Sequence, residues 1–596
     1  MPEEVLDAIE RTEPAGEPEP GLTTLRDPSD IGDLGTADRP GEEGDEIGGA
    51  AHAAPPNLLR SSAVMAVGTV FSRATGFIRT IVLAAAVGTQ LLGDAYQTAN
   101  MVPFAVYDLL IGGLLASVFV PFLVKRKKQD PDGGAATEQR LFTVMLLGLL
   151  AVTVLASLAA PWLISLYAGE FRGDQYDVSV YLARFLLAQI FFIGASGIAS
   201  AMLNTRDRFG APMWAPVLNN LVIITVGLLF LFVVAGPGRT PETVGQQGLT
   251  LLGLGTTAGQ VLQCAVLLWA LRAAGFTWRP RLDLRGSGLG EAVRTASWMM
   301  LYIGVAQAGL LVTTNVATRA GARVAAENGG EAAGAGITAY QFASMLFQLP
   351  YAIIAVSVIT ALLPRMSGHV AEGRRDLVRS DFSRGFRLAS VLLVPVSLAM
   401  VVFAVPFCVL VYARGSTSAE DAAGIGLILM VFAVMLIPFT LFQLQMRVFY
   451  ALGDTRAPAL LAIPAEAAHA ATAIGLLFLA PADMIVVGLP VAYGLYYIVG
   501  AILAWILLRR RLNGLEGRAT VRTLVLLHVA SIPSVAFGVA MIFLFRSVDG
   551  AVVSNLLPVL LGGAVGAILF IFTAKVLRVT EVTTFLDMVR TRLLGR

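Results

Sequence analysis

The feature that most constrains this chain is a succession of apolar runs, about fourteen in number, separated by short polar turns. A run of about 20 apolar residues can cross the hydrocarbon core of a bilayer as a helix. Because lipid offers no hydrogen-bond partners, each run must satisfy its own backbone polar groups, which an α-helix does. The pattern therefore predicts an all-α integral membrane protein. The runs lie near 61–88, 95–124, 141–168, 178–203, 213–236, 248–274, 292–318, 337–364, 386–412, 424–450, 457–480, 483–508, 521–545 and 551–577.

Composition agrees with a membrane protein and offers little support for an enzyme. The chain is 56% hydrophobic and 14% charged, whereas soluble domains carry about 25% charged residues. The turns are too short for an enzyme domain, and we find no Gly-rich phosphate loop, nucleophile elbow or His/Cys metal cluster. Cys264 and Cys408 lie inside apolar runs, which predicts neither a disulfide nor a thiolate metal site. We expect no catalytic activity, no cofactor, no metal and no nucleic-acid partner.

Residues 1–57 differ from the rest of the chain, because they hold fifteen acidic residues and three Arg. Such a segment, rich in Pro and Gly, is predicted to be disordered. It lacks the basic and apolar regions of a secretory signal. Two interpretations stay open, a solvated tail and a segment that docks a regulatory partner.

Basic residues in the turns predict the orientation of the chain. When alternate turns are assigned to the two sides, one side and the C-terminal tail carry thirty-one Lys and Arg and the other side carries six. Basic residues gather on the cytoplasmic side of membrane proteins. We therefore expect a multi-pass protein of the cytoplasmic membrane with both termini inside.

Motifs recur within the chain at nearly one offset, which indicates an internal duplication. Pro161 and Tyr167 recur as Pro406 and Tyr412, 245 residues later. Other proline pairs lie 247 and 246 residues apart, Pro103 with Pro350 and Pro212 with Pro458. Repeats with an even number of spans have the same orientation in the membrane. We predict two parallel six-helix repeats around a central cavity, plus two C-terminal helices. The expected divisions are a tail 1–57, lobes 58–280 and 281–512, helices 13 and 14 at 513–580, and a cytoplasmic tail 581–596.

Charged side chains within the first spans are the strongest candidates for a substrate site. Arg73 and Arg79 are six residues apart, about 120° around a helix, so both could line a wide cavity. Guanidinium groups bind phosphate with two hydrogen bonds, which favours an anionic, phosphorylated substrate. Ser72, Asp94 and Asp108 are candidates for cavity or gating roles. The alternative is structural pairing of Arg73 with Asp108 or of Arg79 with Asp94.

Polar residues in later spans give weaker signals. Gln341 and Gln348 are seven residues apart, hence on one helix face, and are further cavity candidates. Glu466 and His469, at i and i+3, could form a local pair or a proton-linked site. Ordinary interhelical hydrogen bonding is the simpler interpretation of each.

Several motifs occur in an order typical of one transporter family. They are Phe71-Ser72-Arg73, Gly76-Phe77 with Arg79, Gly93-Asp94-Ala95, Leu203-Asn204-Thr205-Arg206, Phe347-Gln348-Leu349-Pro350 and Phe449-Tyr450-Ala451-Leu452-Gly453-Asp454-Thr455. With these motifs the chain resembles the MurJ (MviN) lipid II flippase family of the multidrug/oligosaccharidyl-lipid/polysaccharide exporter superfamily, over roughly residues 58–580. The form of the motifs is similar to that of the actinobacterial branch.

The resemblance implies export of lipid II, a polyprenyl pyrophosphate-linked saccharide-peptide, by alternating access for peptidoglycan synthesis. It implies that Arg73 and Arg79 hold the pyrophosphate, that Asp94 is the family's outer acid, and that residues 521–577 form a groove for the polyprenyl tail. It also implies coupling to membrane potential or Na⁺. H⁺ is a third candidate for the coupling, and from their spacing Glu466 and His469 are the ion-coupling candidates. Besides lipid II and membrane lipids, expected partners include cell-wall synthesis or regulatory proteins, bound through the N-terminal tail.

The chain departs from the family pattern at two positions. Relatives carry further cavity arginines on helices 2 and 8, where ungapped matching puts Tyr107 and Met345 in this sequence. The cavity is then expected to be less positive. Alternative functions are export of another polyprenyl-linked oligosaccharide, drug or cation antiport within the same superfamily, and a membrane scaffold that recruits cell-wall enzymes.

Overall fold

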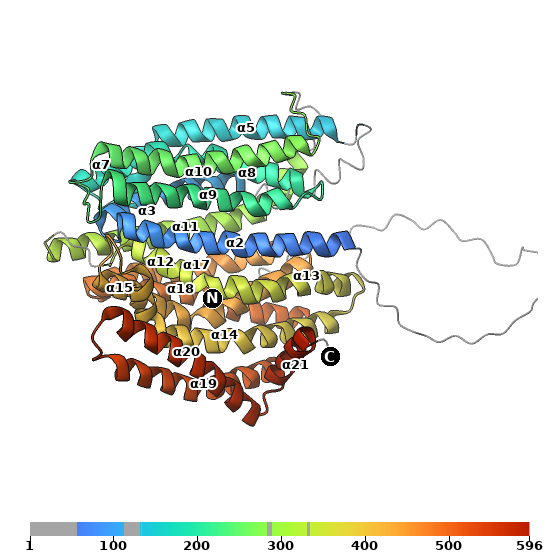
Figure 1. Cartoon of the computed structure of the whole chain (residues 1–596). Helices are drawn as coiled ribbons and strands as arrows, with labels where there is room; N and C mark the ends of the chain where they lie inside the picture. Colours follow the sequence, from blue (N-terminus) through green and yellow to red (C-terminus); the bar gives the residue numbers. More distant parts are fainter. Residues whose placement is uncertain (1–55, 113–131, 133, 283–288, 330–333, 595–596) are drawn as a thin grey trace, which may run out of the picture. The chain divides into compact units, whose positions relative to one another are not determined.

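The computed structural model describes residues 56–112, 132, 134–282, 289–329 and 334–594, and this part of the chain is built of helices (Figure 1). The chain divides into residues 1–64, of which only the beginning of the first helix is described, and residues 65–596. The acidic tail was predicted to be disordered, and its residues 1–55 lie outside the described ranges. All contacts below lie within residues 65–596.

The helices follow the predicted apolar runs closely. In the first part of the chain they are α2 (Pro56–Val87), α3 (Leu91–Tyr107), η1 (Asp108–Gly112), α5 (Ala135–Leu158), α6 (Ala160–Tyr167), α7 (Gly173–Leu186), α8 (Gln189–Asn204), α9 (Gly210–Leu229), η3 (Phe230–Val234) and α10 (Gln246–Ala273). The next are α11 (Leu289–Glu327), α12 (Ile337–Pro350), η4 (Tyr351–Ala355), α13 (Val356–Ala371), α14 (Arg375–Tyr412), α15 (Ala419–Val434), α16 (Leu436–Ala451), α17 (Arg456–Leu479) and α18 (Ala482–Arg511). The last are α19 (Gly517–Phe545), α20 (Ala551–Val576) and α21 (Thr580–Leu594).

Twelve helical segments in the described ranges are long and apolar enough to cross a membrane, or thirteen when the bent pair α15 and α16 is taken as one span. The predicted run at 95–124 is described only as far as residue 112, as α3 and η1. The all-helical membrane architecture is confirmed, whereas the count of fourteen is not. One boundary was wrong, because the run predicted to end at 318 continues as α11 to Glu327.

Prolines explain the main irregularities of the spans. The pair α15 and α16 is bent by 51° at Met435. Pro438 follows in the first turn of α16, where its ring and missing N–H prevent a continuous helix. The repeated prolines Pro103 and Pro350 are each closely followed by a π-helical segment, η1 and η4. The two predicted repeats therefore share this backbone irregularity as well as the motif.

Packing groups the helices along the sequence (Figure 1). We call residues 65–282 the N-terminal half, where α3 packs on α7, α5 on α8 and α9 on α10 around one hydrophobic core. We call residues 289–511 the C-terminal half, where α14 packs on α15, α11 on α17 and α17 on α18. A separate core joins α14 to α19, α20 and α21. The lobe boundaries drawn from the sequence stay a prediction.

Hydrogen bonds join the two halves at the end that the charge pattern predicts to be outer, where α2 ends and α3 begins. We call this region the closed end. The loop before α15 reaches the last turn of α2, with the Ser416 and Thr417 hydroxyls donating to backbone carbonyls at Ala86 and Ala84, 2.9 and 2.7 Å away. Close by, Gln90 Nε2 lies 2.6 Å from a carboxylate oxygen of Asp421. These bonds hold the N-terminal and C-terminal halves together at this end.

Asp94 at the closed end is a buried carboxylate that binds the first turn of α12. Its side chain accepts hydrogen bonds from the Thr338 backbone N–H at 2.9 Å and from the Thr338 hydroxyl at 2.7 Å. The free N–H groups of a helix start attract negative charge. The carboxylate comes so close to Gly336 that a Cβ there would overlap its Oδ2 atom. Position 336 therefore requires glycine for close packing of the two halves.

We expect Gly336→Ala to lower the free energy of unfolding by about 1–3 kcal/mol, because the added methyl overpacks the Asp94 site. The measurement is the thermal midpoint of the purified protein in detergent. Gly304→Ala is the matched control, since Gly304 lies inside α11 with open space around its Cα. An equally stable Gly336→Ala protein would show that Asp94 does not pack against this backbone.

Candidate functional site

A cavity of about 650 Å³ opens within the N-terminal half, and both candidate arginines line it. Its walls come from α2, α3, α8, α9 and α10, with one residue from α12. We call it the arginine cavity. Beside the arginines it is lined by polar groups, among them Ser72, Ser196, Ser200, Asn219, Asn220, Gln260 and Gln263. The structure thus brings Ser72, Arg73 and Arg79 together, as the sequence predicted.

Arg79 is held in place by Asn220, a buried residue of α9. Its Nη1 donates to Asn220 Oδ1 at 3.0 Å. The Asn220 Nδ2 group donates in turn to the Ser72 carbonyl and the Thr75 hydroxyl, both at 3.1 Å. One amide therefore fixes the distance between α2 and α9 and directs the guanidinium. Because a guanidinium has five N–H donors, Arg79 keeps donors available for a ligand.

Arg73, one and a half turns earlier, is exposed to the cavity. Among the ion pairs of the described residues, neither predicted Arg–Asp pair forms. Asp94 instead binds Thr338, and Asp108 is exposed at the start of η1. The interpretation of the arginines as partners of these acids is therefore wrong for this conformation. Two cationic groups directed at one polar cavity can bind an anion.

Tyr107 and Met345, the positions where the resemblance predicts further arginines, both line the arginine cavity. Met345 Sδ lies 2.8 Å from the Thr80 hydroxyl, so α12 of the C-terminal half contacts α2 here. Both residues are on the cavity wall and add no positive charge to it.

A second cavity, of about 270 Å³, lies in the C-terminal half. Five tyrosines contribute to its wall, so we call it the tyrosine cavity: Tyr302, Tyr340, Tyr493, Tyr496 and Tyr497. Gln341, Glu466 and His469 also line it. Gln348 lies outside both cavities, and its amide donates to Ser344 at 3.1 Å. We expected Gln341 and Gln348 to lie on one helix face as cavity residues, but only Gln341 lines a cavity.

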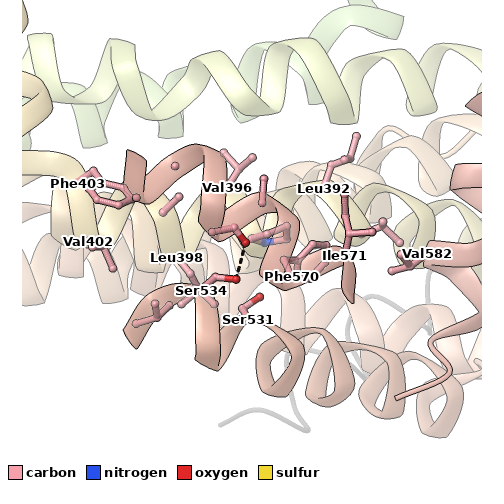
Figure 2. Close-up of a pocket in the computed structure, with 18 of the residues that line it drawn as sticks. Leu392, Val396, Leu398, Val402, Phe403, Ser531, Ser534, Phe570, Ile571 and Val582 are labelled. Carbon is pink, nitrogen blue, oxygen red and sulfur yellow. Dashed lines mark hydrogen bonds between the residues drawn. The ribbon is translucent and has the colours of Figure 1, made fainter. Parts of the chain in front are cut away.

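An apolar groove of about 340 Å³ lies between α14, α19, α20 and α21 (Figure 2). Its wall is almost entirely hydrocarbon, with Phe403 near one end and Val582 near the other (Figure 2). Ser534 donates to the Gly566 carbonyl at 2.7 Å, which satisfies one of its few polar groups (Figure 2). Residues of α21 complete the groove, a helix within the segment that we expected to be a simple tail.

Sequence reasoning missed three contributors to these sites. Asn220 was not singled out, although the pair Asn219-Asn220 within an apolar run is the kind of signal that marks polar contacts in a membrane. The tyrosine cluster comes from three helices, and only Tyr493, Tyr496 and Tyr497, at helical spacing, give a local pattern that could have marked it. The role of α21 depends on Val582, Phe585 and Leu586, whose spacing of three and four residues is that of an amphipathic helix.

A bundle of membrane-spanning helices whose arginines line an internal cavity, and whose last helices form an apolar groove, is typical of a polytopic membrane transporter. Residues 83–562 match the family described as Lipid II flippase MurJ. The match covers most of the chain, and the chain belongs to that family.

Individual relatives and solved structures agree with the family match. The chain is 27% identical over 414 residues to a probable lipid II flippase MurJ of Rhizobium meliloti (strain 1021), covering 68% of this chain and 73% of the relative. It is 26% identical over 414 residues to a lipid II flippase MurJ of Burkholderia cenocepacia, covering 68% and 76%. Among solved structures, a lipid II flippase MurJ in an inward closed conformation superposes with a TM-score of 0.67 at 17% identity, over 89% of this chain and 100% of that one. An inward-facing multidrug resistance transporter of the MATE family gives 0.60 at 16% identity, over 74% and 94%. The last two show a shared fold.

We expect Asn220→Ala to lower the free energy of unfolding by about 1–3 kcal/mol, because it removes the three hydrogen bonds that join the Asn220 amide to α2 and frees Arg79. Asn219→Ala is the matched control, since the neighbouring Asn219 Oδ1 is buried without a hydrogen-bond partner in the described structure. Thermal unfolding in detergent compares the two. Equal losses would mean that Asn220 contributes packing alone.

Proposed function

We propose that this protein exports lipid II, the polyprenyl pyrophosphate-linked peptidoglycan precursor, across the cytoplasmic membrane. The observation that carries the proposal is the arginine cavity, in a chain of the lipid II flippase family. A charged side chain inside a membrane is costly, so arginines directed at a polar cavity indicate an anionic ligand. Arg73 and Arg79 would bind the pyrophosphate, each through the two parallel donors of its guanidinium.

We propose further that the apolar groove receives part of the polyprenyl tail. Its wall of valine, leucine and phenylalanine matches a hydrocarbon ligand and offers almost no polar partner. The saccharide-pyrophosphate would cross through the polar cavity while the tail stays in an apolar surrounding. This division avoids burying the headgroup in lipid, which costs several kcal/mol.

The transport cycle in this proposal alternates access to the arginine cavity. The conformation described here has the halves bonded at the predicted outer end. Substrate would therefore enter from the cytoplasmic leaflet, and the Asp94–Thr338 contacts would break when the cavity opens outward. Both termini would lie inside, and the acidic tail would be available there to cell-wall synthesis or regulatory proteins. The driving force would be membrane potential, H⁺ or Na⁺.

The test of the function is depletion of the protein in its own host, with the leaflet distribution of lipid II as the measurement. We expect lipid II to accumulate on the inner leaflet and growth to fail. Normal arrival of lipid II at the outer leaflet would contradict the proposal. Export of another polyprenyl-linked oligosaccharide would then be the better account, and the lipid that accumulates would identify it.

Rescue of the depleted host tests the arginines. We expect Arg73→Ala and Arg79→Ala to abolish rescue at normal membrane levels, and Arg79→Lys to rescue poorly, because an ammonium lacks the planar pair of donors. Arg184→Ala is the matched control, since Arg184 lies in α7 and does not line the cavity. Full rescue by both cavity variants would remove the arginines from the transport cycle.

A substitution that fills the apolar groove tests whether the groove binds the polyprenyl tail. Gly563→Leu adds a side chain at the wall of the groove, where a Cβ atom meets open space. We expect transport in proteoliposomes to fall at least tenfold while binding of a soluble pyrophosphate headgroup analogue is kept. Gly475→Leu, at an equally open position in α17 away from the groove, should transport normally. Unchanged transport by Gly563→Leu would exclude the groove as a tail site.

A further inference from the structure

The tyrosine cavity contains a carboxylate and an imidazole in direct contact. His469 Nδ1 lies 2.6 Å from Glu466 Oε1, and His469 Nε2 lies 3.1 Å from the hydroxyl of Thr313. His469 is 4% exposed, and the Glu466 side chain 13%. We call the pair Glu466 and His469 the dyad. It joins α17, which carries it, to α11, which carries Thr313.

We propose that the dyad is a reversible proton-binding site and that its proton is the ion coupled to transport. The inference rests on the function proposed above and names the ion and its place. The carboxylate accepts from the ring at Nδ1 whether the ring is neutral or charged. One proton added at Nε2 converts a dyad of charge −1 into a neutral ion pair, and the same proton is released to water when the site is exposed.

The surroundings tolerate both protonation states of the ring. With a neutral ring, Nε2 accepts a hydrogen bond from the Thr313 hydroxyl. With a charged ring, Nε2–H donates to that hydroxyl, which can act either way. Neither state leaves a buried ring nitrogen unpaired, a condition that a group titrating inside a protein must meet to avoid a large cost.

The donor set of this cavity suits a proton better than a metal ion. Small hard cations prefer about six oxygen ligands. Glu466 supplies one carboxylate, and the imidazole occupies its Oε1 side. Among the described residues, no group of three His, Cys, Asp or Glu side chains is placed to hold a metal. The remaining titratable groups of the lining are tyrosines: Tyr302 from α11, Tyr340 from α12, and Tyr493, Tyr496 and Tyr497 from α18. Arg447 of α16, which lies over the Tyr450 ring, is the charged side chain on the tyrosine side.

Because tyrosines are neutral near pH 7, the dyad is the part of the lining that changes charge, with Arg447 as the fixed charge beside it. A carboxylate without its counter-charge is costly in a low dielectric, and protonation of its partner removes that cost. Two of the tyrosines are bonded to each other, since the Tyr497 hydroxyl donates to the Tyr493 hydroxyl at 3.2 Å.

Helix α11 connects the dyad to the N-terminal half. The Glu466 carboxylate lies against the α11 backbone, where a Cβ at Gly309 would be 2.5 Å from it. Directly after Thr313 on the same helix, Thr314 contacts Met101 and Asn315 donates to the Leu166 carbonyl at 2.5 Å. A change of charge at the dyad therefore acts on a helix that binds the N-terminal half. This contact is the physical link between proton binding and the movement of the halves.

The experiment measures the conformation of the protein without lipid II, so its result is separable from that of the flippase test. Spin labels at Arg208→Cys and Ser367→Cys, exposed residues in different halves, report the distance between the halves at the predicted cytoplasmic end. The native Cys264 and Cys408 are buried. The distance distribution is recorded from pH 5 to pH 8.5, in sodium and in choline chloride.

We expect the populations to shift with pH alike in both salts, and the shift to be lost in Glu466→Gln and in His469→Gln. His528→Gln, at an exposed histidine of α19, is the matched control and should keep the shift. Thr313→Val should move the midpoint to lower pH, because the charged ring loses an acceptor, whereas Thr313→Ser should restore it. These two variants keep the dyad and its fold.

Three results would overturn the proposal. A shift that follows sodium at constant pH would assign the site to a metal cation. A pH shift that persists in both dyad variants would place the proton elsewhere. Populations that do not change with pH would make the dyad a structural pair, even if the protein moves lipid II.

Discussion

The cost of placing charge and unpaired polar groups in lipid governs the whole structure. It requires every span to be helical, and it requires the few charged side chains within the spans to have a cavity or a partner. Arg73 and Arg79 face a polar cavity, Asp94 accepts hydrogen bonds from Thr338, and Glu466 is paired with His469. The candidate sites of this transporter are therefore the places where charged side chains have a polar cavity or a polar partner in place of lipid.

Because of the same constraint, different parts of the chain have different chemistry. The N-terminal half supplies cationic donors in its cavity. The C-terminal half supplies a glutamate hydrogen-bonded to a histidine, and the last helices supply an apolar groove. Opposite chemistries can exist in one bundle because α12 stands between the two cavities, with α11 along the tyrosine cavity. Gln341 lines the tyrosine cavity, whereas Met345, one turn later on the same helix, lines the arginine cavity. A movement of these helices must affect both cavities.

Much of the fold was readable in advance because apolar runs and loop charges are local signals. The breaks at Pro350 and Pro438 also follow from single residues. The candidate site was only partly predictable. Arg73 and Arg79 stand out as charges in an apolar run. The alternative of their pairing with Asp108 and Asp94 did not form, since spacing along the chain says nothing of which residues α9 and α12 place beside α2 and α3. Arg79 is bonded to Asn220 instead, and Asp94 is bonded to Thr338.

The sequence by itself determined that the chain is a helical membrane protein of this family, because hydrophobicity and motif order do not depend on long-range contacts. It also determined which residues could carry charge within the bilayer. Only the tertiary structure decided which of them share a cavity and which serve to close one end. The reason is physical: a carboxylate in lipid must find a partner, and the partner of Asp94 lies 244 positions away in the sequence.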